Sequence, residues 1–414
     1  MFPGTSGYRT IFGSRRLKRQ RRQNSADFKV ARRFFPIYAC RRPFLDGSTG
    51  QLVANKFNPA IQVMTPYLAP TSGPGPNSSQ TVDCVVTGAT GLVGNNVVRL
   101  LAQRGNSVRA VVRSADRSLD GLHIQTARAS LDDERGLQAA IDGASFVVHS
   151  AALVHCGWRH RDEMHAVNVE GTRLVARATR RAGARLVHVS SVDAVGLRPD
   201  GIPADEETPP GGMPECPYVV TKREAEDVVR REIDRGLDAV IVNPVYMIGP
   251  WDWKPSSGRM LLEVGAGKGL FAPPGANDFV DVRDVAAGIL SAMQKGRTGR
   301  RYILGGHTLS YLDAWRIFAR AAGRMQPLGI APRPIVRAAG WVGDLVSVFS
   351  RRELPVNSAA VSMSMLSHNF SCARAQAELG YAYRSFESTV SDAWNWFLDH
   401  GFARPMRERT ALAR

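Results

Sequence analysis

The chain has 414 residues, of which 44% are hydrophobic and 22% charged; this is ordinary for a globular protein and allows one large domain with an annex, or two domains. Its net charge is +17, but residues 1–80 carry 13 Lys/Arg and two acidic residues, so only +6 remains for residues 81–414. This distribution excludes a nucleic-acid-binding stripe along the globular part. No apolar run reaches the length of about 18 residues that a transmembrane helix needs, so we expect no membrane span.

The cysteines are odd in number, scattered, and form no CxxC pair. This usage is typical of reduced thiols rather than of a disulfide framework, and we therefore expect a cytoplasmic protein. The five residues are Cys40, Cys84, Cys156, Cys216 and Cys372.

Residues 1–80 are predicted to be a disordered basic arm that ends in the linker APTSGPGPNSSQ (69–80). An export signal would need an apolar stretch after SRRLKRQRRQ (14–23), and a polar, charged segment follows instead. An arm that binds RNA or anionic lipid is the alternative. Met64 lies just before the linker and is an alternative natural start.

A strand, a glycine turn, a helix and a second strand are predicted from residue 82 onward. The apolar run VDCVV (82–86) leads into TGATGLVG (87–94), the helical pattern NNVVRLLAQRG (95–105) follows, and SVRAVV (107–112) is again apolar. In this context Gly88 suits a tight turn, Gly91 a close approach of backbone to a pyrophosphate, and Gly94 the packing of helix on strand. The phosphates would then meet the amide groups at the helix N-terminus.

Six further segments follow in a fixed order, and with the GxxGxxG spacing they resemble the extended short-chain dehydrogenase/reductase family, that is, the NAD-dependent epimerase/dehydratase superfamily. The resemblance runs from about Val82 to about Phe402 and is nearest to dihydroflavonol 4-reductase-like and 3β-hydroxysteroid dehydrogenase-like members. The segments are the buried strand FVVHSAA (146–152), NVEGT (168–172) at the start of a helix, ARLVHVSSVDAVG (184–196), CPYVVTKREAE (216–226), NPVYMIGP (243–250) and FVDVRDVA (279–286).

The resemblance implies an α/β fold, namely a Rossmann-type doubly wound parallel sheet with a smaller, mostly helical C-terminal substrate domain. The expected bounds are 81–250 for the dinucleotide-binding part with a returning segment near 279–300, 251–402 for the substrate-binding part, and 403–414 for a tail.

The resemblance also implies the catalytic residues. Tyr218 is the expected general acid/base, and its phenol pKa must fall from about 10 toward neutrality for that task. Lys222 is one helical turn further on, where its ammonium group would favour the phenolate, and it would also bind the nicotinamide ribose. Ser191 aligns with the serine that binds the substrate oxygen, with Ser190 as the alternative register, and Asn168 with an asparagine that positions the lysine through water.

The cofactor is predicted to be NADP(H) in preference to NAD(H). At the end of the second predicted strand Arg113 stands where an acid would accept from the ribose hydroxyls of NAD, and an arginine suits the 2′-phosphate of NADP. At Ser130 this chain lacks the acid with which the family often holds the adenine amine. The expected cofactor-binding residues are Gly88, Thr90, Gly91, Leu92, Val93, Gly94, Arg113, Ser130, Leu131, Ala151, Ala152, Lys222 and Pro244.

The segment HCGWRHRDEM (155–164) allows several interpretations. Its histidines and Cys156 have spacings that fit neither a zinc knuckle nor two histidines on one helical face, so we expect no metal. It is either a loop over the active site, with Trp158 as a wall for a flat substrate, or a simple surface loop. Trp158, Asp193 and Met247 are the candidates for substrate contact.

Residues 331–352 have apolar residues at helical spacing. The sequence favours a lid helix that packs its apolar face over the substrate pocket, and the alternative is an interfacial helix on lipid, so peripheral membrane contact stays open. Homodimerisation also stays open.

Together these features predict an oxidoreductase that interconverts a ketone and a secondary alcohol on a hydrophobic, cyclic small molecule. The first alternative is a sugar-nucleotide epimerase or dehydratase with tightly bound NAD, in which basic residues would hold a diphosphate. A non-catalytic, nucleotide-sensing or RNA-associated scaffold is the second. The candidate diphosphate ligands are Arg259, Lys268, Arg283 and Arg333.

Overall fold

A computed structural model describes residues 81–350 and 353–404. The chain divides into two units, residues 1–75 and 76–414, and every described residue belongs to the second. The predicted arm and linker, with Met64 and Cys40, lie outside the described residues, as does the predicted tail beyond residue 404. No helix within the described ranges is long and apolar enough to cross a membrane.

The nucleotide half is built on a seven-stranded, wholly parallel sheet with the order β10-β6-β5-β4-β1-β2-β3. The strand order reverses between β1 and β4, and ligands of doubly wound folds bind at such a reversal. The predicted Rossmann-type fold is thereby confirmed. The strands are β1 (Val82–Thr87), β2 (Val108–Val112), β3 (Gln125–Arg128), β4 (Ala144–His149), β5 (Arg185–Val189), β6 (Ala239–Pro244) and β10 (Arg301–Leu304).

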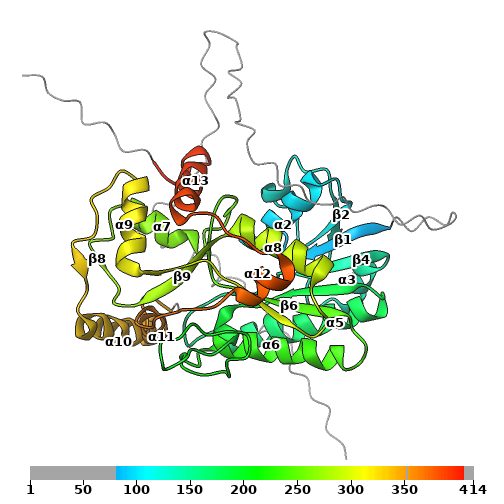
Figure 1. Cartoon of the computed structure of the whole chain (residues 1–414), viewed down its shortest axis with the longest axis horizontal. Coiled ribbons are helices and arrows are strands. Elements are labelled where there is room, and N and C mark those ends of the chain that lie inside the picture. Colours follow the sequence, from blue (N-terminus) through cyan, green and yellow to red (C-terminus); the bar gives the residue numbers. More distant parts are fainter. Residues whose placement is uncertain (1–80, 351–352, 405–414) are drawn as a thin grey trace, which may run out of the picture. The chain divides into compact units, whose positions relative to one another are not determined.

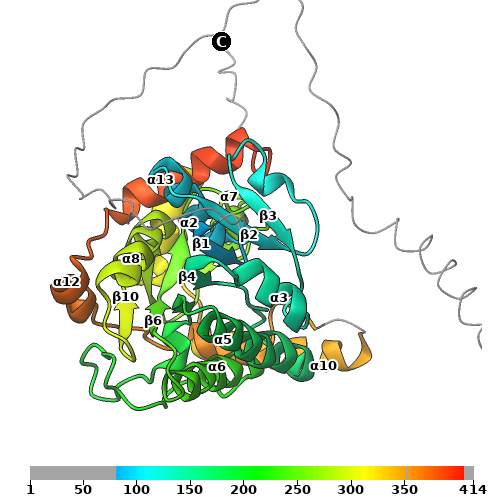
Figure 2. The same ribbon diagram turned by 90° about the vertical axis from the view of Figure 1, so that its right-hand side faces the viewer.

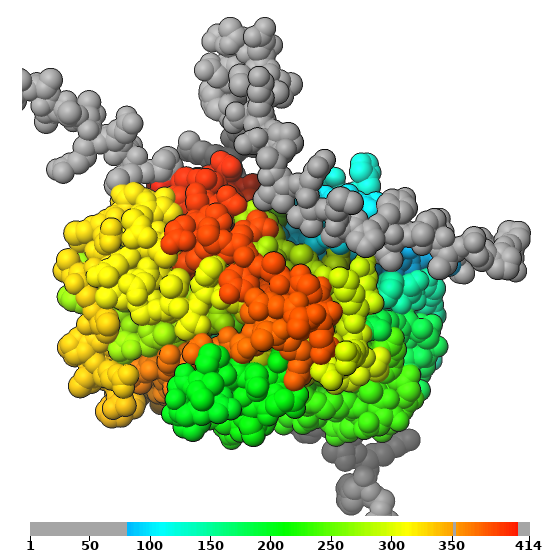
Figure 3. All heavy atoms as spheres, viewed as in Figure 1, coloured from blue at the N-terminus to red at the C-terminus, as the bar shows by residue number. Residues whose placement is uncertain are grey.

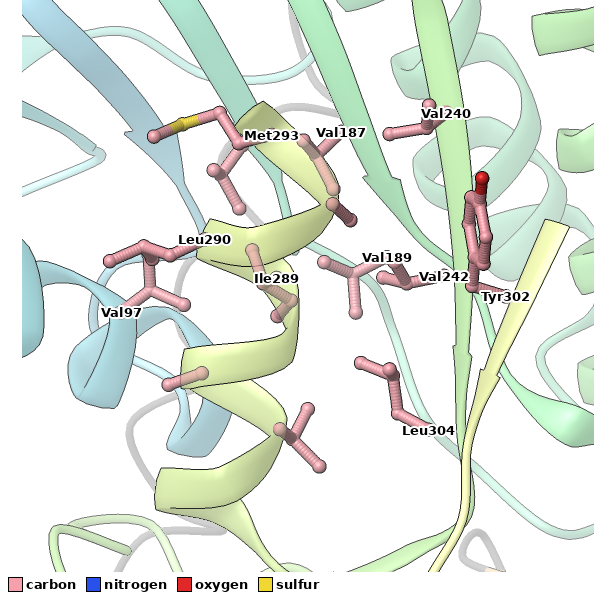
Figure 4. Packing of buried hydrophobic residues seen from close by; sticks show 14 of the residues in the cluster. Val97, Val187, Val189, Val240, Val242, Ile289, Leu290, Met293, Tyr302 and Leu304 are labelled. Carbon is pink, nitrogen blue, oxygen red and sulfur yellow. The ribbon is translucent and has the colours of Figure 1, made fainter. Parts of the chain in front are cut away.

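Helices cover both faces of this sheet (Figures 1 and 2). On one face lie α3 (Glu134–Ile141), α5 (Gly171–Arg181) and α6 (Pro217–Ile233), and on the other α2 (Leu92–Gln103) and α8 (Val282–Lys295). Figure 4 shows how α8 fills its face: Ile289 and Leu290 lie between Val97 of α2 and the valines of β5 and β6. Because strands buried on both faces are apolar throughout, continuous apolar runs in the sequence predicted β1, β2 and β4. The edge strand β3 is partly exposed and has no such run.

The returning segment contributes more than the predicted residues 279–300. It supplies α8 and then β10, which adds the last strand beside β6. A short 3₁₀ turn, Arg117–Leu119, and α12 (Ala373–Leu379) complete this half.

The C-terminal part is mostly helical around a small sheet, β11-β9-β7. Aromatic side chains dominate its separate core, among them Phe279, Phe318 and Phe397. Its strands are β7 (Tyr246–Ile248), β8 (Phe271–Ala272), β9 (Ala276–Asp281), β11 (His307–Ser310) and β12 (Gly329–Ile330). Its helices are α7 (Gly258–Gly265), α9 (Tyr311–Ala321), α10 (Arg333–Phe349), α11 (Ser358–Ser364) and α13 (Phe386–Asp399).

The helical run around NVEGT differs from the prediction. It begins with α4 (Arg161–Met164) and passes through a π-helical segment, His165–Glu170, before α5. NVEGT therefore lies inside the run and does not open it. The acidic residues Asp162 and Glu163 in the first turn suit a helix N-terminus, where carboxylates offset the helix dipole.

The lid expected over residues 331–352 does not form as predicted. Along α10 only Gly340, Gly343 and Ser347 are buried, and the large apolar residues face outward. The predicted helix is present as α10, but it packs through its small residues and not through its large apolar ones.

Candidate active site

A cavity of about 610 Å³ opens at the carboxyl ends of β1, β2 and β4. It brings together most of the residues predicted to bind the cofactor, whereas Leu92, Val93, Gly94, Lys222 and Pro244 are not among its lining. The predicted residues that line it are Gly88, Thr90, Gly91, Arg113, Ser130, Leu131, Ala151 and Ala152.

The glycine turn makes the floor of this cavity. Gly88 has a φ of +70°, and a Cβ there would lie 2.5 Å from the Ala151 amide nitrogen. A Cβ on Gly94 would lie 2.2 Å from the Gly88 carbonyl oxygen, so this glycine lets α2 approach the turn closely. Gly91 is the N-cap of α2, and no side chain of the described residues caps this helix N-terminus. Its first-turn amides suit the pyrophosphate of a dinucleotide, so the residues present fit such a cofactor.

Arg113 at the end of β2 is exposed on the cavity wall, and none of the described residues forms a hydrogen bond or an ion pair with its guanidinium group. Asp116 is engaged instead: its carboxylate accepts from the Ser118 amide at 3.0 Å and from Lys254 Nζ at 2.7 Å. Burial opposes ionisation of Asp116, but these hydrogen bonds outweigh it and hold its pKa below the usual value. Lys254, which also lines the cavity, was missed, because nothing in the sequence signals a contact across 138 residues.

The expected acid near the adenine is absent at Ser130, but one lies two residues further on. Asp132 also lines the cavity, and Ser130 Oγ donates a hydrogen bond to its carboxylate. Sequence reasoning missed Asp132, although the LDD that follows Ser130 was a signal for it.

Tyr218 and Lys222 lie one turn apart at the start of α6, as predicted. Pro217 occupies the first helical position, which its fixed φ favours, and thereby sets where the helix begins. Both side chains are buried, with 8% of Tyr218 and 5% of Lys222 exposed. Lys222 Nζ donates to the Val189 carbonyl oxygen at the end of β5, at 3.2 Å.

Ser191 follows β5 and caps a 3₁₀ turn, Val192–Ala194. Its Oγ donates to Asp193 Oδ2 at 2.9 Å and accepts from the Asp193 amide at 3.2 Å. Its hydroxyl also acts on the Tyr218 phenol, whose pKa it lowers. Ser190, the alternative register, is buried and its Oγ has no partner in the described part of the chain. The serine that meets the tyrosine is therefore Ser191.

The pKa of the Tyr218 phenol is raised, opposite to the expected fall. Burial is the main cause, and the negative charge of Asp193 adds to it, against a hydrogen bond from Ser191. Burial likewise lowers the pKa of Lys222 to about 8, although Glu226 and Asp193 favour its charged form. The phenol is thus protonated at neutral pH, as a proton donor must be, while the lysine keeps its charge below about pH 8.

Asn168 lies in the π-helical segment and joins the cavity to α6 directly. Its Oδ1 accepts from the Leu153 amide at 2.7 Å, and its Nδ2 donates to the Leu153 carbonyl oxygen at 3.0 Å and to Thr221 Oγ1 at 3.1 Å. Leu153 lines the cofactor cavity, and Thr221 precedes Lys222. Asn168 therefore positions α6 through direct contacts, and a water bridge to Lys222 stays a prediction.

The loop that contains Trp158 is held by Glu353, which follows α10. The Glu353 carboxylate contacts His155 Nε2 at 2.6 Å and accepts from the amides of Trp158 and Arg159 at 2.8 and 3.1 Å. The Trp158 indole donates to Ser358 Oγ at 2.8 Å and is 48% exposed. Over residues 81–350 and 353–404, no group of three or more His, Cys, Asp or Glu could hold a metal ion.

Asp193 lies among several titratable groups, and its role in substrate contact stays a prediction. Its carboxylate is half-buried, and its charge acts on Tyr218, Cys156 and Tyr311. Burial raises the pKa of Tyr311 to about 12, so this phenol is a neutral hydrogen-bonding group. Met247 lies on β7 and packs against the core of the nucleotide half. Sequence reasoning missed Tyr311, which comes from α9 and is distant in the chain.

Comparison with known proteins agrees with this geometry. Residues 84–305 match the model of the NAD dependent epimerase/dehydratase family. The chain belongs to this family, and it is an NAD(P)-dependent oxidoreductase.

Two curated relatives and one solved structure cover nearly the whole globular chain. Sterol demethylase protein B of Methylococcus capsulatus is 37% identical over 77% of this chain and 98% of its own length. A putative dihydroflavonol 4-reductase of Synechocystis sp. is 34% identical over 78% of this chain and 96% of its own. The crystal structure of gox2253 has a TM-score of 0.69 at 35% identity and covers 78% of this chain and 100% of that one.

Proposed function

We propose that this protein is an NADP(H)-dependent reductase that interconverts a ketone and a secondary alcohol on a hydrophobic, cyclic small molecule. The observation that carries the proposal is the buried, protonated Tyr218 in contact with Ser191. Both named relatives support it, because one is called a dihydroflavonol 4-reductase and the other a sterol demethylase protein.

Ser191, Tyr218 and Lys222 have different roles in the proposed reduction of a ketone. The reduced nicotinamide, when bound, supplies a hydride to the carbonyl carbon. Ser191 turns its hydroxyl from Asp193 to the carbonyl oxygen, and Tyr218 donates the proton that completes the alcohol. After this transfer Tyr218 is a phenolate, which the buried ammonium group of Lys222 stabilises. A proton from solvent then restores the Tyr218 phenol.

The preference for NADP(H) rests on the charges at the end of β2. The Arg113 guanidinium group has no partner among the described residues, whereas Asp116, the next acid along the chain, already accepts from Lys254 and Ser118. A 2′-phosphate would therefore meet a free cation, whereas Asp116 is already engaged and is not free to accept from the hydroxyls of an NAD ribose.

The first alternative, a sugar-nucleotide epimerase or dehydratase, needs cations for a diphosphate. Three of the four candidates are neutralised by acids: Arg259 and Lys268 both pair with Glu263, and Arg283 pairs with Asp281 and Asp392. The fourth, Arg333, lies on the outward-facing α10. The buried triad likewise argues against the non-catalytic scaffold.

Nucleotide binding separates these functions. The purified protein is denatured to release any bound nucleotide, and the native protein is titrated with NADPH and with NADH while nicotinamide fluorescence is recorded. The reductase predicts little co-purified nucleotide and tighter binding of NADPH. Stoichiometric co-purified NAD would contradict it in favour of an epimerase, and a protein that binds neither cofactor would contradict both enzymes.

A further inference from the structure

The outward side of α10 is a broad apolar surface. Seven large apolar residues of this helix are exposed, with 68% of Trp341 and 85% of Phe349 accessible. They project away from the buried edge formed by Gly340, Gly343 and Ser347. The residues of this surface, called the α10 face below, are Ile335, Trp341, Val342, Leu345, Val346, Val348 and Phe349.

The α10 face is exposed because the helix packs by its narrow edge. The buried edge lies on the segment around α11, and a Cβ at Gly343 would come within 1.8 Å of the Val356 carbonyl oxygen. α10 runs along the periphery of the C-terminal part (Figures 1 and 2), and its gold atoms form the lower left rim of Figure 3. Next to its start, Phe271 of β8 and Ile330 of β12 are also half-exposed, which widens the apolar area.

The charges beside this face are cationic. Arg333 and Arg337 lie one turn apart on α10, and within the described ranges neither forms a hydrogen bond or an ion pair. The acids nearby are turned away: Asp344 accepts from the Ser358 amide at 3.1 Å, and Glu353 holds the Trp158 loop. Exposed tryptophan and phenylalanine flanked by unpaired arginines are typical of helices that lie in the headgroup region of a bilayer.

We propose that the α10 face docks this protein onto an anionic phospholipid bilayer. The charge pattern favours lipid over a second copy of the chain, since a second α10 face would add two more arginines while its nearby acids, Asp344 and Glu353, are already engaged. Anionic headgroups complement Arg333 and Arg337, while Trp341 and Phe349 enter the boundary of the acyl chains.

Docking at this face would also bring the loop that contains Trp158 to the bilayer. The C-terminal end of α10 is tied to that loop, because Arg159 donates to the carbonyl oxygens of Ser347 and Ser350 and Asn357 donates to that of Cys156. Hydrophobic ketones concentrate in membranes, so a docked enzyme would take its substrate from the lipid phase. This consequence rests on the proposed function, whereas the docking itself does not.

Vesicle flotation tests the docking. The full chain is mixed with vesicles of phosphatidylcholine and phosphatidylglycerol, at low salt and at about 0.5 M salt, where long-range attraction by residues 1–80 is screened. The Trp341→Ser/Phe349→Ser double variant is compared with Ile202→Ser, whose side chain is 56% exposed and outside α10. We expect wild type and Ile202→Ser to float at both salt concentrations, and the double variant to partition about tenfold to hundredfold less at high salt.

A second variant tests the charges. Arg333→Gln/Arg337→Gln should lower partitioning at low salt by about tenfold and have little effect at high salt. Equal flotation of wild type and the Trp341→Ser/Phe349→Ser variant at high salt would overturn the proposal. A wild-type protein that does not float would also overturn it. A dimer in sedimentation equilibrium that this variant abolishes, without flotation, would assign the face to a second copy. NADPH binding and reduction of a water-soluble ketone should be the same in all variants, so failure of docking is distinguishable from failure of the proposed function.

Discussion

The nucleotide half and the C-terminal part differ in which side chains they bury and which they leave exposed. In the nucleotide half the polar groups around the predicted catalytic residues are buried and bonded: the Asn168 side chain makes three hydrogen bonds, and Lys222 donates to a backbone carbonyl oxygen. In the C-terminal part α10 leaves Trp341 and Phe349 in solvent. The polar groups of the proposed reaction are thus enclosed by the protein, whereas the α10 face is open to a partner outside it.

Buried carboxylates show the same contrast. Glu226 in α6 accepts from Asn243 at 2.6 Å and from Arg230 at 2.7 Å, so its charge is compensated. Asp278 in β9 is as deeply buried, accepts from the Gly306 amide at 2.9 Å, and is paired with no cation of the described residues. Burial therefore raises the pKa of Asp278 to about 7.

The largest expected effect comes from the proton donor of the nucleotide half. Tyr218→Phe removes the phenolic hydroxyl and keeps the ring, so turnover should fall by about 10³-fold or more while NADPH binding changes little. Single-turnover kinetics and a fluorescence titration on the same samples check this. Tyr383→Phe, at a tyrosine outside the site, is the control and should keep full activity. If Tyr218→Phe turns over like wild type, the catalytic assignment is wrong.

The next effect is on stability, in the C-terminal part. The raised pKa of Asp278 means that the folded state holds its proton more tightly than the unfolded state. The resulting stability is complete below about pH 4 and is lost as pH rises through about 7. Asp278→Asn should therefore exceed wild type in free energy of unfolding by about 2–4 kcal/mol at pH 8 and approach it at pH 4. Urea unfolding at the two pH values measures this, and a difference independent of pH would refute the explanation.

A smaller effect is expected on the preference for NADPH over NADH in the cofactor cavity. Arg113→Asp should weaken NADPH binding by about tenfold to hundredfold and change NADH binding little, because only NADPH carries the 2′-phosphate. Titration with both cofactors checks it, with Arg104→Asp, on an exposed arginine at the end of α2, as the charge-matched control. Equal losses of affinity for NADPH and NADH would show that Arg113 does not bind the 2′-phosphate.

The smallest effect is a limb of the pH profile. Because burial lowers the pKa of Lys222 to about 8, its ammonium charge is lost above that pH, and kcat/KM for ketone reduction should fall there by up to about tenfold per pH unit. Lys222→Arg keeps the charge and should move this limb well above pH 8, even where its overall rate is lower. A limb at the same pH in both proteins would assign the ionisation to another group.

The sequence predicted the parts of the site that lie within short segments. A strand–turn–helix unit of this kind requires glycine at positions 88 and 94, because neighbouring backbone comes too close there for a Cβ atom. Tyr218 and Lys222 are four residues apart on α6, so one helical turn separates them. The sequence could not predict the direction of the Tyr218 pKa shift, because burial and Asp193 act through the folded surroundings.

Contacts between distant segments were equally hidden. Lys254 meets Asp116 and Glu353 holds the loop at Trp158, and neither pair has a local pattern. On α10 the apolar spacing predicted a helix correctly, but spacing gives no direction for packing. The small residues Gly340 and Gly343 were the signal for the packed edge.

Reduction of a hydrophobic ketone by NADPH, the proposed activity of this enzyme, can be measured directly. The protein is incubated with NADPH and a panel of cyclic apolar ketones, ketosteroids and dihydroflavonols among them, and both nicotinamide absorbance and the organic product are followed. We expect that, for at least one ketone, each alcohol formed consumes one NADPH, and that Tyr218→Phe abolishes both changes. This expectation would be contradicted if no ketone were reduced while a sugar nucleotide was epimerised without net consumption of cofactor.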